Sequence, residues 1–275
     1  MINRNNITTV AMLTMLLVGL SGCRSGGAGQ ERDMGMEFAA GYGLEAVTVD
    51  DVEMRGVIYR PAGHGEASLP IVLFLHGYGE CGRDGQRHLT VGLPPAIMLE
   101  PERWPFVVVM PQKPEFNVEW EMYEAQVMEL LEVAAARYGG DDSRVAITGL
   151  SQGGHGTIAI GSRHPERFRC AAPVCGYVAA WNSGGVKRPG RTTGNDPVLR
   201  AAADGLAQMP VRIFHGGRDS VVPVSESQAL RDALEAQGAD VTLAVYADAD
   251  HNSWDQAYRE SGVWTWIQAC LDKAE

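Results

Sequence analysis

Residues 144–166 read RVAITGLSQGGHGTIAIGSRHPE, in which a strand pattern, a turn and a helix pattern follow one another directly. The run RVAITG is largely apolar, and the segment after Gly153 is rich in small residues that let a helix pack closely against a sheet. Ser151 lies at the junction, in the pattern G-x-S-x-G formed with Gly149 and Gly153. A strand that turns sharply into a helix at a serine is typical of a nucleophile on a strained turn. The serine could instead simply cap the helix, so the rest of the chain has to separate the two interpretations.

The segments on either side continue the alternation of strand and helix. A hairpin is predicted over residues 44–61, where apolar and polar residues alternate. Continuous apolar runs, typical of strands covered on both faces, then alternate with helical periods. Strands are predicted within 70–77, 106–112, 144–149, 170–176, 210–216 and 240–251, and helices within 124–140, 153–166, 196–208, 225–238 and 262–271. This order predicts an α/β fold, with a mostly parallel central sheet opened by an antiparallel hairpin and helices on both faces.

The first residues form a different pattern. A basic start precedes a mostly apolar run from Ile7 to Leu20, and the small-residue sequence LSGC ends at Cys23. These are the parts of a secretory signal, and the ending resembles a bacterial lipobox, which implies cleavage before Cys23 and lipid attachment to its thiol. An ordinary signal peptide with a chance cysteine is the alternative. We predict an exported protein anchored to the bacterial cell envelope, with a signal peptide at 1–22, a flexible tether at 23–43 and a catalytic domain at 44–275.

Charge and cysteine content exclude some classes of function. The chain of 275 residues has a formal net charge of −11, and its first 22 residues contribute one arginine and no acid. This balance argues against nucleic-acid binding, which draws on basic patches, and against a basic membrane-binding face. An exported protein can hold disulfides, but we favour buried free thiols and no metal site for the four remaining cysteines, Cys81, Cys170, Cys175 and Cys270.

Partners for Ser151 follow at the ends of later strands. A serine needs a base, and the base needs an acid to orient it; in this fold class the chain order is serine, acid, histidine. Asp219 comes just beyond one predicted strand, and His251 just beyond the next. Both therefore fall on the carboxyl edge of the sheet, where open α/β folds bind ligands. Asp248 and Asp250 are rival acids, but they belong to the same loop as His251 and are poorly placed to reach behind its ring.

The other histidines have less direct interpretations. His155 follows Ser151 by about one helical turn, so it is a candidate to line or support the site. His76 and His215 precede glycines at strand ends, where backbone groups are expected to satisfy their rings. We predict that His64, His88 and His164 are exposed.

The sequence LHGYGECGRDG, residues 75–85, contains a literal G-x-G-x-x-G that would suit a nucleotide-binding oxidoreductase. The context does not fit, because polar residues and glycines continue where a helix should start and the next strand ends in proline and glutamine rather than an acid. The loop fits an oxyanion hole better, with the backbone N–H of Tyr78 paired with that of Gln152 and Gly79 as the alternative to Tyr78. No cofactor is expected.

From about Leu44 to Leu271 the chain resembles the α/β-hydrolases of the dienelactone hydrolase and feruloyl or acetyl-xylan esterase type, which are often grouped with prolyl oligopeptidase-type domains. LHGYGECGRDG, VVVMPQ, ITGLSQGG, FHGGRDSVVPV and DADHNSWDQAY carry the resemblance. GLSQGG is also similar to the acyl-protein thioesterase and carboxylesterase branch. Dienelactone hydrolases proper carry a cysteine where this chain has Ser151, which favours ester over lactone hydrolysis.

The resemblance implies a serine carboxylesterase that acts on small or carbohydrate esters, such as feruloyl or acetyl esters, through an acyl-enzyme. A serine peptidase, an acyl thioesterase and a tethered binding module without activity are the alternatives. Aromatic residues that could form a substrate subsite are Trp254, Trp120, Trp181 and Tyr123, of which Trp254 is best placed because it closely follows His251.

Overall fold

A computed structural model of the protein describes residues 38–180 and 196–273. The predicted signal peptide, Cys23, most of the predicted tether and Trp181 lie outside these residues.

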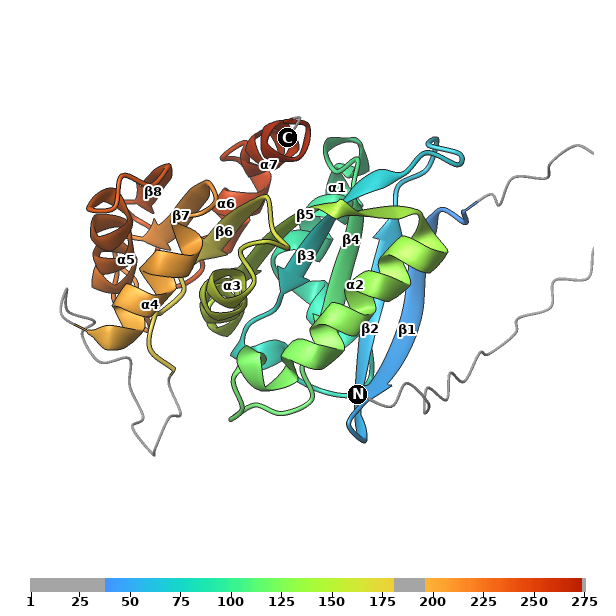
Figure 1. Ribbon diagram of the computed structural model, residues 1–275, viewed down its shortest axis with the longest axis horizontal. Helices are drawn as coiled ribbons and strands as arrows, with labels where there is room; N and C mark the ends of the chain where they lie inside the picture. The colour runs from blue at the N-terminus through green and yellow to red at the C-terminus, as the bar shows by residue number, and fades with distance from the viewer. Residues whose placement is uncertain (1–37, 181–195, 274–275) are drawn as a thin grey trace, which may run out of the picture.

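An eight-stranded sheet forms the centre of the described part of the chain (Figure 1). Its strand order is β1-β2-β4-β3-β5-β6-β7-β8. β2 runs antiparallel to both of its neighbours, β1 and β4, and the other pairs are parallel. The predicted architecture, a mostly parallel sheet opened by an antiparallel hairpin, is confirmed. The strands are β1 (Gly41–Val49), β2 (Val52–Arg60), β3 (Leu69–Leu75), β4 (Val107–Gln112), β5 (Gly140–Leu150), β6 (Cys170–Val174), β7 (Val211–Gly216) and β8 (Val241–Tyr246).

The opening hairpin begins earlier than the sequence pattern indicates. β1 starts at Gly41, inside the segment predicted as a tether, because its first residues continue the ladder and Gly41 pairs with Arg60. The turn consists of Asp50 and Asp51, both with positive φ, 51° and 61°. A two-residue turn of this kind matches the twist of the strands it joins, and aspartate tolerates the left-handed region better than most residues.

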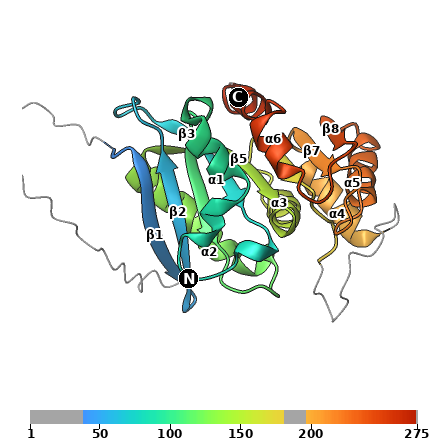
Figure 2. The same ribbon diagram turned by 180° about the vertical axis from the view of Figure 1, so that it is seen from behind.

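Helices cover both faces of the sheet (Figures 1 and 2). One face carries α2 (Glu124–Tyr138), α3 (Gln152–Arg163), α4 (Pro197–Leu206) and α5 (Ser225–Glu235). The opposite face carries α1 (Leu93–Leu99), α6 (Trp254–Arg259) and α7 (Val263–Leu271). The two short helices, α1 and α6, were not predicted, because six or seven residues are too few to establish a helical period.

Two hydrophobic cores result, one on each side of the sheet. Along β3, Ile71 and Leu73 belong to the core beneath α2 and α3, whereas Val72 and Phe74 belong to the core beneath α1 and α6. Successive side chains of a strand point to opposite faces, so a strand buried on both faces must be apolar at every position. This is why PIVLFL and FVVVM are continuous apolar runs.

Cys81, Cys170, Cys175 and Cys270 are buried and not paired in disulfides, as predicted. None of the helices in the described residues has the length and apolar character required to cross a bilayer.

Candidate active site

Ser151 lies on a strained turn between β5 and α3. Its φ of 54° and ψ of −115° are values that few residues with a side chain adopt. The turn is held by a hydrogen bond from the Ser151 N–H to Val174 O at 2.9 Å. Glycines allow the close packing around it: a Cβ on Gly153 would overlap the carbonyl oxygen of Leu75, and one on Gly149 would lie 2.6 Å from the same oxygen. The G-x-S-x-G pattern therefore lets α3 approach β3.

The structure brings the three predicted side chains together. Ser151 Oγ lies 2.9 Å from His251 Nε2, and His251 Nδ1 lies 2.8 Å from Asp219 Oδ2. A carboxylate can only accept, so Nδ1 carries the proton and Nε2 is left to accept the Ser151 hydroxyl proton. Hydroxyl, imidazole and carboxylate in this order form a chain that can activate a serine as a nucleophile. β5, β7 and β8 each place one of these residues at the carboxyl edge of the sheet.

Asp219 is fixed by four hydrogen-bonding contacts and its side chain is fully buried. Its Oδ1 accepts from the N–H groups of Val221 and Val222 at 2.9 and 2.8 Å, and His215 Nε2 lies 3.2 Å from Oδ2. Burial raises the pKa of Asp219, but the contacts with His215, His251 and Val222 outweigh it and hold that pKa well below its usual range. The carboxyl group is therefore ionised throughout the neutral range. The contact with His215 was not predicted; only backbone partners were expected for that ring, which also meets Val222 O at 2.9 Å.

A cavity of about 550 Å³ opens above Ser151. Its walls combine aromatic side chains with a few polar ones: Tyr78, Glu80, Asn117, Gln152, Tyr177 and Trp254 line it together with Ser151 and His251. Trp254 therefore lies where the sequence places it, and its ring meets that of His251 edge-on, with centroids 5.5 Å apart. Burial raises the pKa of the Glu80 carboxyl group, which was not singled out from the sequence.

The two predicted oxyanion donors both lie at the start of a helix. Tyr78 begins a 3-10 turn after β3, and Gln152 begins α3 after β5. N–H groups at a helix start have no acceptor within the helix. Because β3 and β5 are adjacent in the sheet, with Leu75 opposite Gly149, the two turns emerge side by side, and both residues line the cavity. Gly79 also lines it and stays the alternative donor.

Two of the predicted aromatic subsite residues are not in the cavity wall. Trp120 is fully buried below it, where its Nε1–H donates to His76 O at 3.1 Å and its ring packs edge-on against the ring of His76. Tyr123 is also buried and outside the lining. Both belong to a 3-10 turn that packs against α3, so their side chains point into the protein and not into the cavity.

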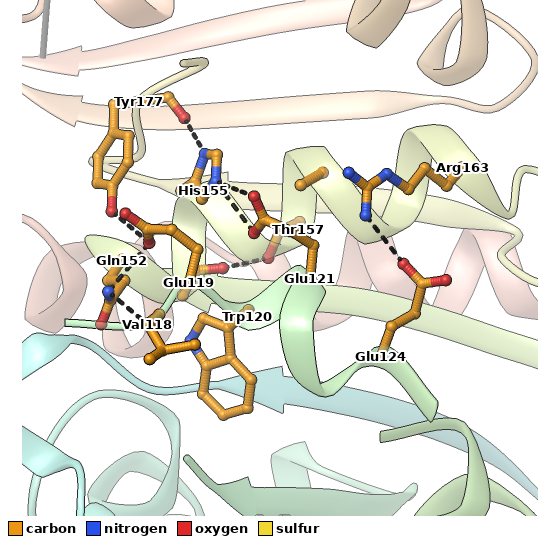
Figure 3. A network of polar contacts seen from close by, with 12 residues as sticks. Val118, Glu119, Trp120, Glu121, Glu124, Gln152, His155, Thr157, Arg163 and Tyr177 are labelled. Carbon is orange, nitrogen blue, oxygen red and sulfur yellow. Dashed lines mark hydrogen bonds and ion pairs between the residues drawn. The ribbon is translucent and has the colours of Figure 1, made fainter. Parts of the chain in front are cut away.

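His155 also lies behind the cavity wall and does not line it. It is buried, its ring stacks on that of Tyr177 with centroids 4.6 Å apart, and its Nδ1–H donates to Tyr177 O at 3.0 Å (Figure 3). Burial alone would lower the pKa of His155, but the adjacent carboxylate of Glu121, 3.3 Å from Nε2, raises it. The prediction that His155 lines the site is thus wrong, and a supporting role through Tyr177 stays a prediction.

Three histidines predicted to be exposed, His64, His88 and His164, are not. His88 is fully buried, with its Nε2–H donating to Met110 O at 2.9 Å, and His64 and His164 are half-buried. His76 is satisfied by backbone groups as predicted: Nδ1–H donates to Gly77 O at 2.7 Å, and Nε2 accepts from the N–H of Lys113 at 2.9 Å.

Within the described residues, one group places three potential metal-binding atoms within 4.8 Å of one another: Cys175, Asp219 and His251. The carboxylate and the imidazole already bond to each other, and burial raises the pKa of Cys175 to about 12. A thiol that keeps its proton at neutral pH is a poor metal ligand, because the thiolate is the form that binds. This group fits the Ser151–His251–Asp219 chain better than a metal centre.

The site lies within a recognisable family region. The family model of the dienelactone hydrolase family matches residues 115–262, more than half of the chain. The chain belongs to the dienelactone hydrolase family. Residues 115–262 contain Ser151, Asp219 and His251, whereas Tyr78 lies before them.

Two proteins are similar to this chain in sequence and one crystal structure is similar to it in fold. A putative carboxymethylenebutenolidase of Salmonella typhimurium is 32% identical over 117 residues, which are 42% of this chain and 39% of that protein. Esterase YjfP of Escherichia coli is 25% identical over 219 residues, covering 66% of this chain and 82% of its own length. The crystal structure of a putative dienelactone hydrolase from Klebsiella pneumoniae superposes with a TM-score of 0.58 at 22% identity, covering 85% of this chain and 98% of the other. At that identity the superposition shows a shared fold.

Sequence reasoning missed two hydrogen-bonded residues of the site: Tyr177 in the cavity wall and Glu119 behind it. Glu119 is 5% exposed and its Oε2 accepts from Tyr177 OH at 2.9 Å (Figure 3). Both residues come from segments without a regular period. The available signal was a pair of glutamates on either side of a tryptophan, in the sequence VEWE, and it has no meaning until the fold is known.

Proposed function

We propose that the protein is a serine-dependent carboxylic ester hydrolase. The observation that supports this most directly is the hydrogen-bonded chain from Ser151 through His251 to Asp219, with distances of 2.9 and 2.8 Å, whose Ser151 and His251 line the cavity. The names of the similar proteins, an esterase and putative carboxymethylenebutenolidases, are consistent with hydrolysis at a carboxylic ester or lactone.

The proposed reaction has two steps. His251 Nε2 takes the hydroxyl proton as Ser151 Oγ attacks the ester carbonyl, and the N–H groups of Tyr78 and Gln152 receive the negative oxygen. The imidazolium, stabilised by Asp219, then protonates the leaving alkoxide, which departs as the alcohol and leaves an acyl-serine. Water gives its proton to His251 and attacks this acyl group, and the Ser151 alkoxide leaves with that proton, releasing the acid.

For the substrate, we propose esters of hydroxyl-rich compounds such as carbohydrates, with acetyl or aromatic acyl groups such as feruloyl. Three aromatic side chains in the cavity wall, Tyr78, Tyr177 and Trp254, offer flat surfaces for a ring, and Asn117 offers hydrogen bonds to hydroxyl groups. A cavity of about 550 Å³ has room for a substituted phenyl ring together with part of a sugar.

The test of this function is the activity of Ser151→Ala on p-nitrophenyl esters. We expect kcat to fall by on the order of 10⁴-fold or more without loss of the fold, as judged by circular dichroism and thermal unfolding. Ser162→Ala is the matched control, because Ser162 lies on the same helix and its hydroxyl bonds only to Ala159 O among the contacts described. Normal turnover by Ser151→Ala would refute the assignment.

The same preparations separate the competing substrate classes. A panel of acetyl, butyryl, feruloyl and long-chain esters, with matched thioester and peptide substrates, ranks kcat/KM for each. Labelling by a fluorophosphonate, lost in Ser151→Ala, distinguishes an enzyme from a binding module. Preference for a peptide or a thioester would contradict the proposed ester specificity while leaving the nucleophile in place.

We also propose that the protein is exported and anchored by lipid on Cys23. The pattern LSGC at 20–23 supports this. Metabolic labelling with a fatty-acid analogue should modify the wild-type chain and not Cys23→Ser. Labelling that persists in Cys23→Ser would contradict the proposal.

A further inference from the structure

Both predicted oxyanion donors are attached through their side chains to one short segment, residues 116–119. From one side, Tyr78 OH donates to Asn117 Oδ1 at 3.1 Å. From the other side, Gln152 Nε2 lies within hydrogen-bonding distance of three acceptors of the segment: Phe116 O and Val118 O, each at 3.3 Å, and Glu119 Oε2 at 3.0 Å. The side chains of both residues whose N–H groups would receive the oxyanion are thus joined to this one segment.

Glu119 makes the shortest of these contacts with Gln152. Its Oε2 is 3.0 Å from Gln152 Nε2, and it is the one side-chain acceptor among the three, the other two being backbone carbonyls at 3.3 Å. The same oxygen, Oε2, also accepts from Tyr177 OH, so it is fixed from two directions (Figure 3). The segment itself is held by the buried Lys113, whose Nζ donates to Val118 O at 2.6 Å. The carboxylate of Glu119 is therefore a rigid attachment point.

The turn attached there needs such support. Ser151 has a φ of 54°, and a backbone in a sparsely populated region persists only when its surroundings determine its position several times over. Val174 O holds the turn at the N–H of the strained residue itself, Ser151. Gln152 follows that residue directly, and its side chain is anchored at Glu119. Releasing this anchor would allow the first turn of α3 to relax and its N–H groups to move.

We propose that Glu119 is a positioning residue of the oxyanion hole: through Gln152 it holds the strained turn after β5 in the orientation that directs the Gln152 N–H at the reacting carbonyl. This inference rests on the proposed function. A small displacement matters because a misplacement of about 1 Å can lower a rate by about 10²-fold, and loss of one oxyanion donor costs on the order of 10²- to 10³-fold. A displaced donor should cost less than a lost one.

The bond to Tyr177 gives Glu119 a second, separable effect. Tyr177 lines the cavity, and His155 stacks on the ring of Tyr177 from behind. Displacement of this wall would change ground-state binding and so KM, whereas displacement of the oxyanion donor would change mainly kcat. Tyr177→Phe removes the bond to Glu119 and keeps the ring. It should therefore affect KM more than kcat.

The experiment compares Glu119→Ala, Glu119→Gln and Glu124→Gln with wild type, measuring kcat, KM, thermal stability and the affinity of a boronic acid. A boronic acid forms a tetrahedral adduct with the serine and reports on the oxyanion hole directly. Glu124→Gln is the matched control, because Glu124 pairs with Arg163 and His164 and does not line the cavity. For Glu119→Ala we expect kcat to fall about 10- to 100-fold, boronic acid affinity to fall in parallel and KM to stay within about threefold.

Glu119→Gln keeps an acceptor oxygen and should recover most of the loss. Gln152→Met removes the side-chain amide but keeps the backbone N–H, so it should reproduce the loss of Glu119→Ala and tests the inference if Glu119→Ala fails to fold. In the double variant that combines Glu119→Ala with Gln152→Met, kcat should fall no further than in either single variant, because both substitutions break the same link between Glu119 and Gln152. The inference would be overturned by losses of kcat that add in the double variant, or by a kcat for Glu119→Ala within about twofold of wild type. It would also be overturned if Glu119→Ala changed KM alone. An inactive wild type would refute the proposed function and this inference with it; an active wild type with unaffected Glu119 variants would refute this inference alone.

Discussion

Replacement of Asp219 by asparagine tests whether the carboxylate keeps the ring proton of His251 on Nδ1. Asp219 Oδ1 accepts hydrogen bonds from two backbone N–H groups, those of Val221 and Val222. The NH₂ group of an asparagine cannot accept these hydrogen bonds. The asparagine oxygen must therefore stay at that position, and its NH₂ group must take the place of Oδ2. This places a donor 2.8 Å from His251 Nδ1, where the carboxylate accepts a hydrogen bond from Nδ1–H.

The consequence is the wrong tautomer of the imidazole. With Nδ1 forced to accept, the ring proton moves to Nε2, the atom 2.9 Å from Ser151 Oγ, and the serine loses its base. The same change in a trypsin-like protease lowers kcat by about 10⁴-fold, which corresponds to ~5 kcal/mol in the activation barrier. We expect a loss of this size here. KM should change little, because Asp219 does not line the cavity.

The assay is steady-state hydrolysis of p-nitrophenyl acetate, with thermal unfolding measured on the same samples. Asp248→Asn and Asp250→Asn are the controls, since these are the rival acids in the sequence: Asp248 pairs with Arg218, and Asp250 accepts from the N–H of Ser220 at 2.8 Å. Each should keep kcat within about threefold of wild type. A folded Asp219→Asn protein with less than about a tenfold loss would show that His251 does not depend on this carboxylate.

Four shorter predictions concern packing, substrate binding and pH. Gly153→Ala should lower the free energy of unfolding by about 1–3 kcal/mol in urea titrations, because the added Cβ would overlap Leu75 O, and unchanged stability would contradict this packing. Trp120→Ala should cost about 3–5 kcal/mol in the same assay. Trp254→Ala should mainly raise KM, since Trp254 is half-buried in the cavity wall. A raised KM in Trp120→Ala together with a loss of stability in Trp254→Ala would contradict these two assignments. Burial lowers the pKa of His88 from 6.5 to about 4, so the unfolded chain binds a proton between these values that the folded chain does not. Stability should therefore fall as pH drops from 6.5 to 4, less steeply in His88→Gln, and parallel pH profiles would refute this.

Much of the fold, and the three residues Ser151, His251 and Asp219 of the candidate site, could be predicted from sequence patterns. The strand run at 144–149, the glycines around Ser151 and the helical period after it specify the turn between β5 and α3. Asp219 and His251 could be identified because parallel strands end at one edge of the sheet, so residues far apart in the chain meet there. The spacing of apolar residues and the order of serine, acid and histidine along the chain carry this information. Neither depends on the details of side-chain packing.

The surroundings of individual side chains depended on the tertiary structure. Trp120 and Trp254 were both candidates for the substrate subsite, with Trp254 preferred for its place after His251, yet only Trp254 lines the cavity, whereas Trp120 is buried against His76. Glu119 had no assigned role, and only the packing of residues 116–119 against the start of α3 places its carboxylate beside Gln152. The period of a segment fixes which face of an element a residue occupies. What lies opposite that face is contributed by segments far away in the chain, and their positions follow from the packing of the whole domain.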